Sequence, residues 1–438
     1  MRTISRPALA ATCTFITCSL LLGACGSSSS GTGGQAAVDE GTNFTVLIQN
    51  ENPSLTKNLD TLAQGVCADP NKALPIAHEN VAQADVIQKI TLLASQNALP
   101  NHFVAGTAQV RPAGDLGKAA VLLDYEKKMT ELGVWDQISP AAAATVKGVY
   151  GQMVSLPYSY NIEGIWFNKK ILADNGISEP KTWDDLTAAM AKLKGAGITP
   201  ITQGGQAGWP LTRIVGMYIF RNVGPNAMAD VRDGKAKLTD PAYVAGAQAL
   251  VDLGTKGYLG EGVTSRTADA ATAQFLTGKA AMNYNGSWLL ANINDPKQNT
   301  IGVDNVGFMP FPTVSGGKGN AGQWAANAGT AMAWNSKNFG PKSAAWLTCI
   351  AKNYGKVAAD QGQISGFKSS TPAASTSTAT KKVQDTVSSA TESVLWFEAL
   401  MDSKSNALAS TNVALLVSGQ MSPADYMSKL QASLDANK

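Results

Sequence analysis

Short strand patterns alternate with helical patterns along this chain, and that alternation is the strongest constraint on its fold. Residues 44–48 (FTVLI) predict a first strand, and Asn52-Pro53 is typical of the N-cap and first residue of a helix. Alternation on this scale predicts open sheets that are covered by helices, and hence an α/β protein. The apolar residues of the first helix recur at helical spacing, as Leu55, Leu59, Leu62 and Val66.

Further segments continue the alternation. Residues 148–168 are predicted to be extended, and a capping box from Thr182 to Asp185 starts a helix that ends at Gly195 or Gly197. Four tryptophans are expected in cores, namely Trp166, Trp183, Trp334 and Trp346. Other predicted helices run through Val86, Ile90 and Leu93, from Pro241 to about Gly254 and from Pro341 to about Tyr354, with strands at 305–312 and 329–334.

Length and charge limit the classes of function. The chain of 438 residues is long enough for two or three domains and a substantial core. Its formal net charge is only +3, so it has no large basic field with which to hold nucleic acid. Charged residues make up only 15% of the chain, which favours a compact α/β protein over a disordered or coiled-coil one.

The N-terminus is typical of an exported protein. Residues 1–24 combine two arginines with an apolar run, which predicts a signal peptide. The run ends in LLGAC (21–25), which resembles the bacterial lipobox, so Cys25 is the predicted site of lipid attachment. The alternative is an ordinary signal peptide with an incidental cysteine. The Gly/Ser-rich residues 25–39 predict a flexible tether between a membrane and a folded body.

The cysteines and histidines predict neither a metal site nor a cofactor. Beyond the predicted signal and lipid site, only Cys67 and Cys349 remain, and two alternatives stay open: they pair, or they are separate buried thiols. Neither belongs to a CxxC motif. The only histidines are His78 and His102, and the HEN at 78–80 is not the HExxH of zinc proteases.

The segment FLTGKAAMNYNGSW (275–288) carries a candidate ligand site. A helix is predicted to end before Gly278, a short strand to follow, and Asn285-Gly286 to turn the chain into a new helix near Ser287. Ligands of open α/β sheets bind at turns after the carboxyl ends of strands. Amides suit the hydroxyls of a sugar, and the flat face of Trp288 suits its C–H faces. Trp288 as a core residue remains the alternative.

Two segments together resemble a known family. SLPYSYNIEGIWFNKKILADNGISEPKTWDDL (155–186), followed by residues 275–288, resembles the extracellular solute-binding proteins of sugar ABC importers, the maltose-binding-protein-like group. The resemblance implies a two-lobed type II periplasmic-binding-protein fold, in which each lobe is an open sheet flanked by helices and the ligand lies in the cleft between them. It implies lobe one at 40–154 and 322–372, and lobe two at 155–321 and 373–438.

The resemblance also implies candidate site residues. Asn161, Trp209, Trp288 and Trp324 match positions at which relatives often contact ligand, while Tyr158 and Tyr160 stay open between hinge packing and ligand contact. Residues 99–110 depart from the family pattern, which leaves the sugar and its length undefined. The full set of expected ligand-binding residues is Gln49, Glu51, Asn161, Trp209, Asn285, Gly286, Trp288, Trp324 and Asn327.

The function implied is that of a monomeric receptor, not an enzyme, held by a lipid at the extracellular face of the bacterial cell membrane. It would bind a mono- or short oligosaccharide and deliver it to the permease subunits of an ABC transporter. Two alternatives remain: a binding protein for a non-sugar solute, and a secreted carbohydrate-active enzyme, although no nucleophile elbow or histidine-based triad is present. The implied boundaries place Cys67 and Cys349 in the same lobe, where a bridge would join two distant segments.

Overall fold

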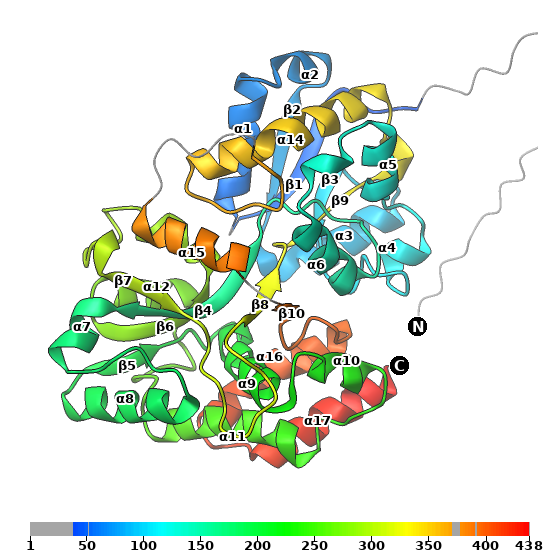
Figure 1. Cartoon of the computed structure of the whole chain (residues 1–438). Helices are drawn as coiled ribbons and strands as arrows, with labels where there is room; N and C mark the ends of the chain where they lie inside the picture. Colours follow the sequence, from blue (N-terminus) through cyan, green and yellow to red (C-terminus); the bar gives the residue numbers. More distant parts are fainter. Residues whose placement is uncertain (1–37, 51, 370–376, 390–391, 438) are drawn as a thin grey trace, which may run out of the picture. The chain divides into compact units, whose positions relative to one another are not determined.

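The computed structural model describes residues 38–50, 52–369, 377–389 and 392–437. The predicted signal peptide, Cys25 and residues 25–37 of the predicted tether lie outside the described residues. Within the described ranges the strands form two sheets, which we call the β1 sheet and the β4 sheet (Figure 1). The β1 sheet and its helices make up lobe one, and the β4 sheet and its helices make up lobe two.

The β1 sheet has the strand order β2-β1-β3-β9, in which β1 pairs parallel with β2 and β3, and β9 pairs antiparallel with β3. Its core includes Phe44, whose ring stacks on Trp334 and on Trp346 with ring centroids 4.9 Å apart in both pairs. The strands are β1 (Phe44–Gln49), β2 (Ile76–Val81), β3 (His102–Ala105) and β9 (Ala331–Trp334). The helices of this lobe are α1 (Pro53–Gln64), α2 (Ala68–Ala73), α3 (Val86–Ser95), α4 (Asp115–Lys118), α5 (Tyr125–Glu131), α6 (Pro140–Tyr150) and α14 (Pro341–Asp360).

The β4 sheet has the order β10-β8-β4-β6-β5, and β7 also pairs with β4. Because side chains alternate along a strand, Asn161, Glu163 and Ile165 share one face of β4, while Ile162 and Trp166 lie on the other. Apolar clusters cover both faces, so this sheet is buried on both sides. The strands are β4 (Asn161–Asn168), β5 (Thr199–Thr202), β6 (Ala280–Gly286), β7 (Val306–Met309), β8 (Gln323–Asn327) and β10 (Glu392–Val394).

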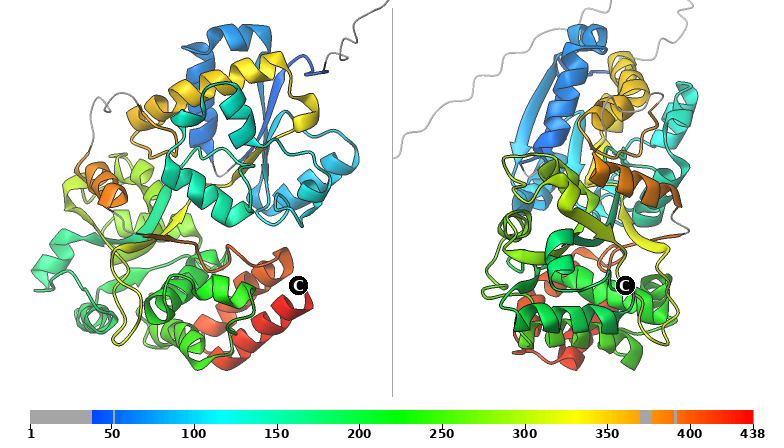
Figure 2. Two further views of the ribbon diagram at one scale, coloured as in Figure 1. Left: turned by 45° about the vertical axis from the view of Figure 1, so that its right-hand side comes forward. Right: turned by 60° about the vertical axis from the view of Figure 1, so that its left-hand side comes forward.

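Helices from the C-terminal part of the chain complete lobe two, where α16 packs against α9 and α11, and α17 packs against α11 and α16 (Figure 2). The α-helices of this lobe are α7 (Lys169–Asp174), α8 (Trp183–Gly195), α9 (Trp209–Val223), α10 (Ala227–Arg232), α11 (Pro241–Thr255), α12 (Ala268–Leu276), α13 (Leu290–Ile293), α15 (Thr378–Ser389), α16 (Ser403–Val417) and α17 (Pro423–Ala436). Short 3₁₀ turns occur in both lobes. Those of lobe one are η1 (Gln83–Asp85), η2 (Trp135–Gln137) and η5 (Ser336–Asn338), and those of lobe two are η3 (Ser287–Leu289) and η4 (Val303–Asn305).

Predictions that rest on local capping are confirmed. The Thr182 side chain accepts from the Asp185 backbone N–H and the Asp185 side chain accepts from that of Thr182, so the capping box of α8 is present. Gly278 has a φ of +74° just after α12, as a left-handed helix stop requires. The expected core tryptophans Trp166, Trp334 and Trp346 are fully buried, and Trp183 is half-buried against Phe311.

Several predicted boundaries are wrong. Val66 lies beyond the end of α1 and is 67% exposed, and the N-cap Asn52 makes no side-chain capping bond. Residues 148–150 belong to α6, so the predicted extended segment is a strand only from Asn161 onward. Asn285 and Gly286 do not form a turn, because they pair with Gly164 and Glu163 as the last residues of β6. The helix expected after them is only η3 and the one-turn α13. Strand β10 was not predicted.

The chain crosses between the lobes at residues 151–160, which join α6 to β4, and again at 328–330, which join β8 to β9. The second crossing was expected near the glycine-rich residues 313–323, and that expectation is wrong because β8 pairs with β4 and β10. The expected return to lobe two at residues 372–373 lies outside the described residues. The other lobe boundaries stay predictions.

Candidate functional site

A pocket of about 110 Å³ lies between the lobes, beside the start of β4. Asn161 and the half-buried Trp288 line it from lobe two, and Asn52 and Gln363 line it from lobe one. Tyr158 and Ser159, from the first crossing, lie between these two sets. The remaining lining residues are Ser54, Leu55, Ser287, Leu290, Ala291, Tyr354 and Ile364. Hydroxyls, amides and aromatic rings therefore surround one small space.

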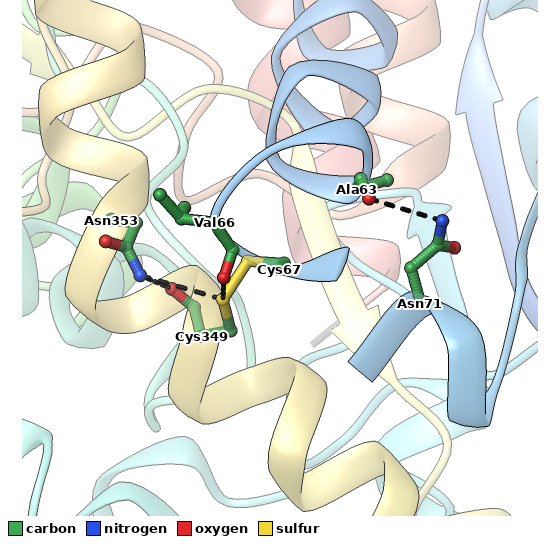
Figure 3. Close-up of a disulfide and its surroundings, with 6 residues drawn as sticks. All are labelled: Ala63, Val66, Cys67, Asn71, Cys349 and Asn353. Atoms are coloured by element: carbon green, nitrogen blue, oxygen red, sulfur yellow. Dashed lines mark hydrogen bonds between the residues drawn. A yellow bond between two sulfur atoms is a disulfide. The ribbon is translucent and has the colours of Figure 1, made fainter. Parts of the chain in front are cut away.

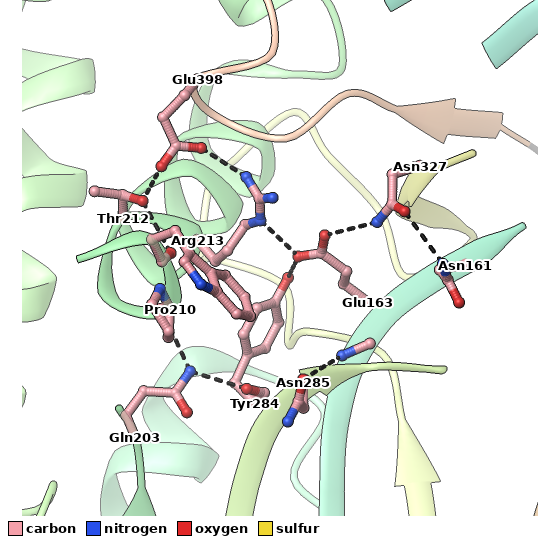
Figure 4. A network of polar contacts seen from close by, with 12 residues as sticks. Asn161, Glu163, Gln203, Pro210, Thr212, Arg213, Tyr284, Asn285, Asn327 and Glu398 are labelled. Carbon is pink, nitrogen blue, oxygen red and sulfur yellow. Dashed lines mark hydrogen bonds and ion pairs between the residues drawn. The ribbon is translucent and has the colours of Figure 1, made fainter. Parts of the chain in front are cut away.

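A chain of hydrogen bonds fixes Asn161 at the pocket wall (Figure 4). Its Nδ2 donates to Asn327 Oδ1 and to Ser159 Oγ, both at 3.2 Å, and its Oδ1 accepts from Ser287 Oγ at 3.2 Å. Asn327 Nδ2 in turn donates to Glu163 Oε1 at 3.3 Å. Strands β4 and β8 bring these side chains together, because Asn161 pairs directly with Asn327 in the sheet. The rotamer of Asn161 is thus set before any ligand arrives.

Behind this chain, one arginine is held between two buried carboxylates (Figure 4). Arg213 Nε lies 3.1 Å from Glu163 Oε2, and its Nη1 lies 2.6 Å from Glu398 Oε2. Tyr284 donates to Glu163 at 3.3 Å, and Thr212 donates to Glu398. Burial raises the pKa of both glutamates, and the Arg213 charge opposes that rise.

Aromatic rings link the arginine to the pocket. The Arg213 guanidinium carbon lies 5.7 Å from the ring centre of Trp209 and 5.1 Å from that of Trp396. Trp209 meets Trp288 edge-to-face, with ring centroids 5.9 Å apart and planes at 68°. The Trp288 ring at the pocket wall is therefore linked through Trp209 to Arg213, which comes from α9, and through Arg213 to Trp396, which lies before α16.

The structure places the predicted site residues in different environments. It brings Asn161 and Trp288 into the pocket, and Asn327 and Trp209 into contact with them. A Cβ at Gly286 would lie 2.0 Å from the Trp288 ring, so this glycine makes room for the indole and not, as expected, for a ligand.

The other predicted residues lie elsewhere. Asn285 is buried and donates to Asn283 Oδ1 at 3.0 Å. Trp324 was expected to contact ligand, but it does not line the pocket: it is 6% exposed and its ring stacks on Phe308 at 5.4 Å. Gln49 lines a separate shallow depression at the end of β1. Glu51 lies outside the described residues.

Sequence analysis missed Glu163, Arg213, Trp396 and Glu398. Glu163 carried a signal, because it is the one charged residue in the otherwise apolar or amide stretch NIEGIWFN. Tyr158 and Tyr160, which were left open, are both buried; Tyr158 packs edge-on against Tyr354 and also lines the pocket, while Tyr160 bonds Ser393 at 3.1 Å.

Cys67 and Cys349 form a disulfide, which decides between the two alternatives (Figure 3). Their Cα atoms lie 5.8 Å apart, and the bond joins the residue before α2 to the middle of α14. Among the described residues, no helix has the length and apolar character needed to span a membrane. Nor do His, Cys, Asp and Glu side chains of these residues form a group of three that could hold a metal ion.

Two α/β lobes, joined by crossing segments and lined at their junction by amides and aromatic rings, define the two-lobed class of solute-binding proteins. The family of bacterial extracellular solute-binding proteins matches residues 78–361, and the chain belongs to this family. Its members are receptors and do not form an enzyme family.

Relatives and solved structures agree with that assignment. A probable sugar-binding periplasmic protein of Mesorhizobium japonicum is 28% identical over 232 residues, which are 52% of this chain and 54% of that protein. A second such protein, from Rhizobium meliloti, is 29% identical over 210 residues, 46% of this chain and 48% of its own. The chain thus spans about half the length of the curated relatives it matches. The structure of a chitin oligosaccharide binding protein is 26% identical, with a TM-score of 0.78 over 90% of this chain and 99% of that one.

Proposed function

We propose that the protein is an extracellular receptor that binds a neutral mono- or short oligosaccharide between its lobes and passes it, unchanged, to an ABC transporter permease. The observation that carries this proposal is the pocket wall, where Trp288 offers a flat apolar face beside the amides of Asn161, Asn52 and Gln363. Aromatic faces and amide groups are what sugar rings and hydroxyls need. The names of the relatives, which speak of sugar or chitin oligosaccharide binding, support the same class of solute.

Catalysis is not part of the proposal. A glycosidase needs two carboxyl groups that flank the scissile bond. Glu163 and Glu398 are buried, both are engaged by Arg213, and neither lines the pocket. Their role is to hold Arg213 and its neighbouring rings in place.

Lobe motion is part of the proposal. The pocket of about 110 Å³ is smaller than the roughly 300–1,000 Å³ of most ligand sites. A sugar therefore requires the lobes to part, and bending at residues 151–160 and 328–330 would allow that. Closure on the sugar would then create the form that the permease recognises. We also propose that Cys25 carries the lipid, that the glycine- and serine-rich residues after it form the tether, and that the receptor acts as a monomer at the outer face of the membrane.

A thermal-shift screen tests the proposal, because a ligand that binds only the folded state raises the melting temperature. The panel would contain monosaccharides, chito- and xylo-oligosaccharides, spermidine, zinc and glycerol 3-phosphate. We expect one sugar class to stabilise the protein, at roughly micromolar Kd or about −8 kcal/mol. Chromatography of the mixture after incubation should show the sugar unchanged. Stabilisation by the amine, metal or phosphate ester alone, or sugar turnover, would contradict the proposal.

A further inference from the structure

Arg221, on α9 of lobe two, is a buried cation with an incomplete set of hydrogen bonds. The residue is 0% exposed, and its Nε donates to the Phe311 carbonyl at 2.9 Å. Within the part of the chain that the structure describes, its Nη1 and Nη2 have no hydrogen-bond partner. Each of these nitrogens carries two N–H groups, so most of the guanidinium donors are unpaired. Buried donors normally have a partner, because leaving them without one costs free energy.

Two other arginines of lobe two are well supplied with acceptors. Arg213 lies between two buried carboxylates. Arg266 donates from Nη1 to the Leu259 carbonyl at 2.9 Å and from Nη2 to the Glu261 carbonyl. The fold thus provides oxygen atoms for the terminal nitrogens of Arg266 and a counter-charge for Arg213, and among the described residues it provides neither for Arg221.

The charge of Arg221 is uncompensated as well. Burial lowers the pKa of Arg221 to about 10, so the guanidinium stays protonated at neutral pH. Among the described ionisable groups, Tyr284 is the one with a resolved effect on it. Burial raises the pKa of the Tyr284 hydroxyl, so that group is neutral at pH 7 and supplies no counter-charge. A buried charge without a partner is strongly unfavourable, and an anion at the free donors would relieve both problems at once.

The glycine-rich residues 313–323 lie against the same arginine. The Gly319 N–H donates to the Arg221 carbonyl at 3.0 Å. A Cβ at Gly317 would lie 2.2 Å from that carbonyl oxygen, so only glycine lets the loop approach so closely. Because Phe311 accepts from the Arg221 side chain and the loop just after it binds the Arg221 main chain, this segment encloses the residue. The enclosure excludes a bulky anion, and one positive charge is balanced by one negative charge.

We propose that Nη1 and Nη2 of Arg221 form a buried site for a small monovalent anion, a halide such as chloride, inside lobe two. The anion would accept the unpaired N–H groups and neutralise the guanidinium, and it would stabilise the folded lobe as any ligand of the folded state does. Neither Arg221 nor Phe311 lines the interlobe pocket, so the two sites are separate. The halide site would keep this role even if the solute between the lobes were not a sugar.

Urea unfolding at constant ionic strength tests the proposal, with sodium gluconate replaced stepwise by sodium chloride. A ligand of the folded state lowers the unfolding equilibrium constant by the factor 1 + [L]/Kd, and for the wild-type protein we expect a fall of at least about fivefold at about 0.2 M chloride. Arg221→Met removes the charge but keeps a long side chain, and should abolish the chloride response. Arg232→Met, which removes an exposed arginine, is the matched control and should respond as the wild type does.

Bromide locates the site directly. Crystals of the wild-type protein grown in sodium bromide should show an anomalous scattering peak within hydrogen-bond distance of Arg221 Nη1 and Nη2, which keeps the test valid if Arg221→Met does not fold. Three results would overturn the proposal: no chloride response of the wild-type protein, an equal response of Arg221→Met, or ordered water alone at these nitrogens. Thermal shift with the sugar panel reads the interlobe pocket, so failure at either site is recognised separately.

Discussion

Removal of the Arg213 charge should destabilise the protein strongly at neutral pH. Glu163 and Glu398 are 1% and 2% exposed in their side chains, and Arg213 is the cation between them. In Arg213→Met the two carboxylates would remain buried without a cationic partner, and the neutral donors Tyr284, Asn327 and Thr212 would still contact them. Loss of one member of a buried ion pair typically costs about 3–5 kcal/mol, because the remaining charge is left uncompensated. We expect a loss of that size at pH 7.

The loss should shrink as the pH falls. Burial already raises the pKa of both glutamates above the usual value, and without Arg213 both pKa values should rise further. The folded variant then binds more protons than the unfolded chain, so its free energy of unfolding decreases as the pH rises from about 4.3 toward the folded pKa. The deficit relative to the wild-type protein should therefore be smaller at pH 5 than at pH 7.

Urea unfolding followed by circular dichroism measures the effect, provided the m-value stays constant. Arg232→Met is the matched control, because Arg232 pairs with Asp233 where both side chains are exposed, and it should cost less than about 1 kcal/mol. The triple variant Glu163→Gln, Arg213→Met, Glu398→Gln should recover much of the loss, since no buried charge is left in this cluster. If Arg213→Met costs no more than Arg232→Met, or costs the same at pH 5 as at pH 7, the reasoning is refuted.

Three further predictions concern lobe one and its contact with lobe two. The Cys67–Cys349 bridge closes a loop of 282 residues, so the Cys67→Ser, Cys349→Ser variant should lose about 2–5 kcal/mol in urea unfolding; equal urea midpoints with and without reductant would contradict this. Burial lowers the pKa of His102 to about 3, so its contribution to stability should fall below pH 6.5 by up to about 1.4 kcal/mol per pH unit, because the unfolded chain takes up the proton. The difference in unfolding free energy between wild type and His102→Asn should then change across pH 4–6.5, and a constant difference would count against it. Arg111 of lobe one donates to the Met401 and Ala399 carbonyls of lobe two, so Arg111→Ala should increase the radius of gyration of the ligand-free protein in X-ray scattering, and an unchanged radius would show that Arg111 does not hold the lobes together.

Features with a local cause could be predicted from the sequence. The capping box of α8, the glycine stop after α12 and strand β1 depend on residues a few positions apart, and all three are present. Asn285-Gly286 looked like a turn by the same local criteria. Pairing with β4 extends β6 through both residues, and the indole of Trp288 occupies the space that a side chain at Gly286 would need.

The candidate site could be predicted only in part, because its members come from distant segments. Asn161 and Trp288 were found through their place in family-like motifs. Arg213 and Glu398 lie 185 residues apart, and nothing local in the sequence indicates that they pair. Trp324 was misplaced for a related reason: its segment pairs with β4, and only that long-range pairing shows that the ring faces an apolar cluster.

The most direct test of the interlobe site is calorimetric titration of the best sugar from the thermal-shift screen into three variants and the wild-type protein. Trp288→Ala should raise Kd about 5- to 150-fold, equivalent to about 1–3 kcal/mol. Asn52→Ala, on the opposite lobe, should weaken binding by about 0.5–1.5 kcal/mol, because it removes one hydrogen bond to the sugar. Folding should be unaffected, since the Asn52 side chain makes no capping bond. Trp183→Phe, remote from the pocket, should leave Kd unchanged. Wild-type affinity in both folded pocket variants would contradict a sugar site between the lobes.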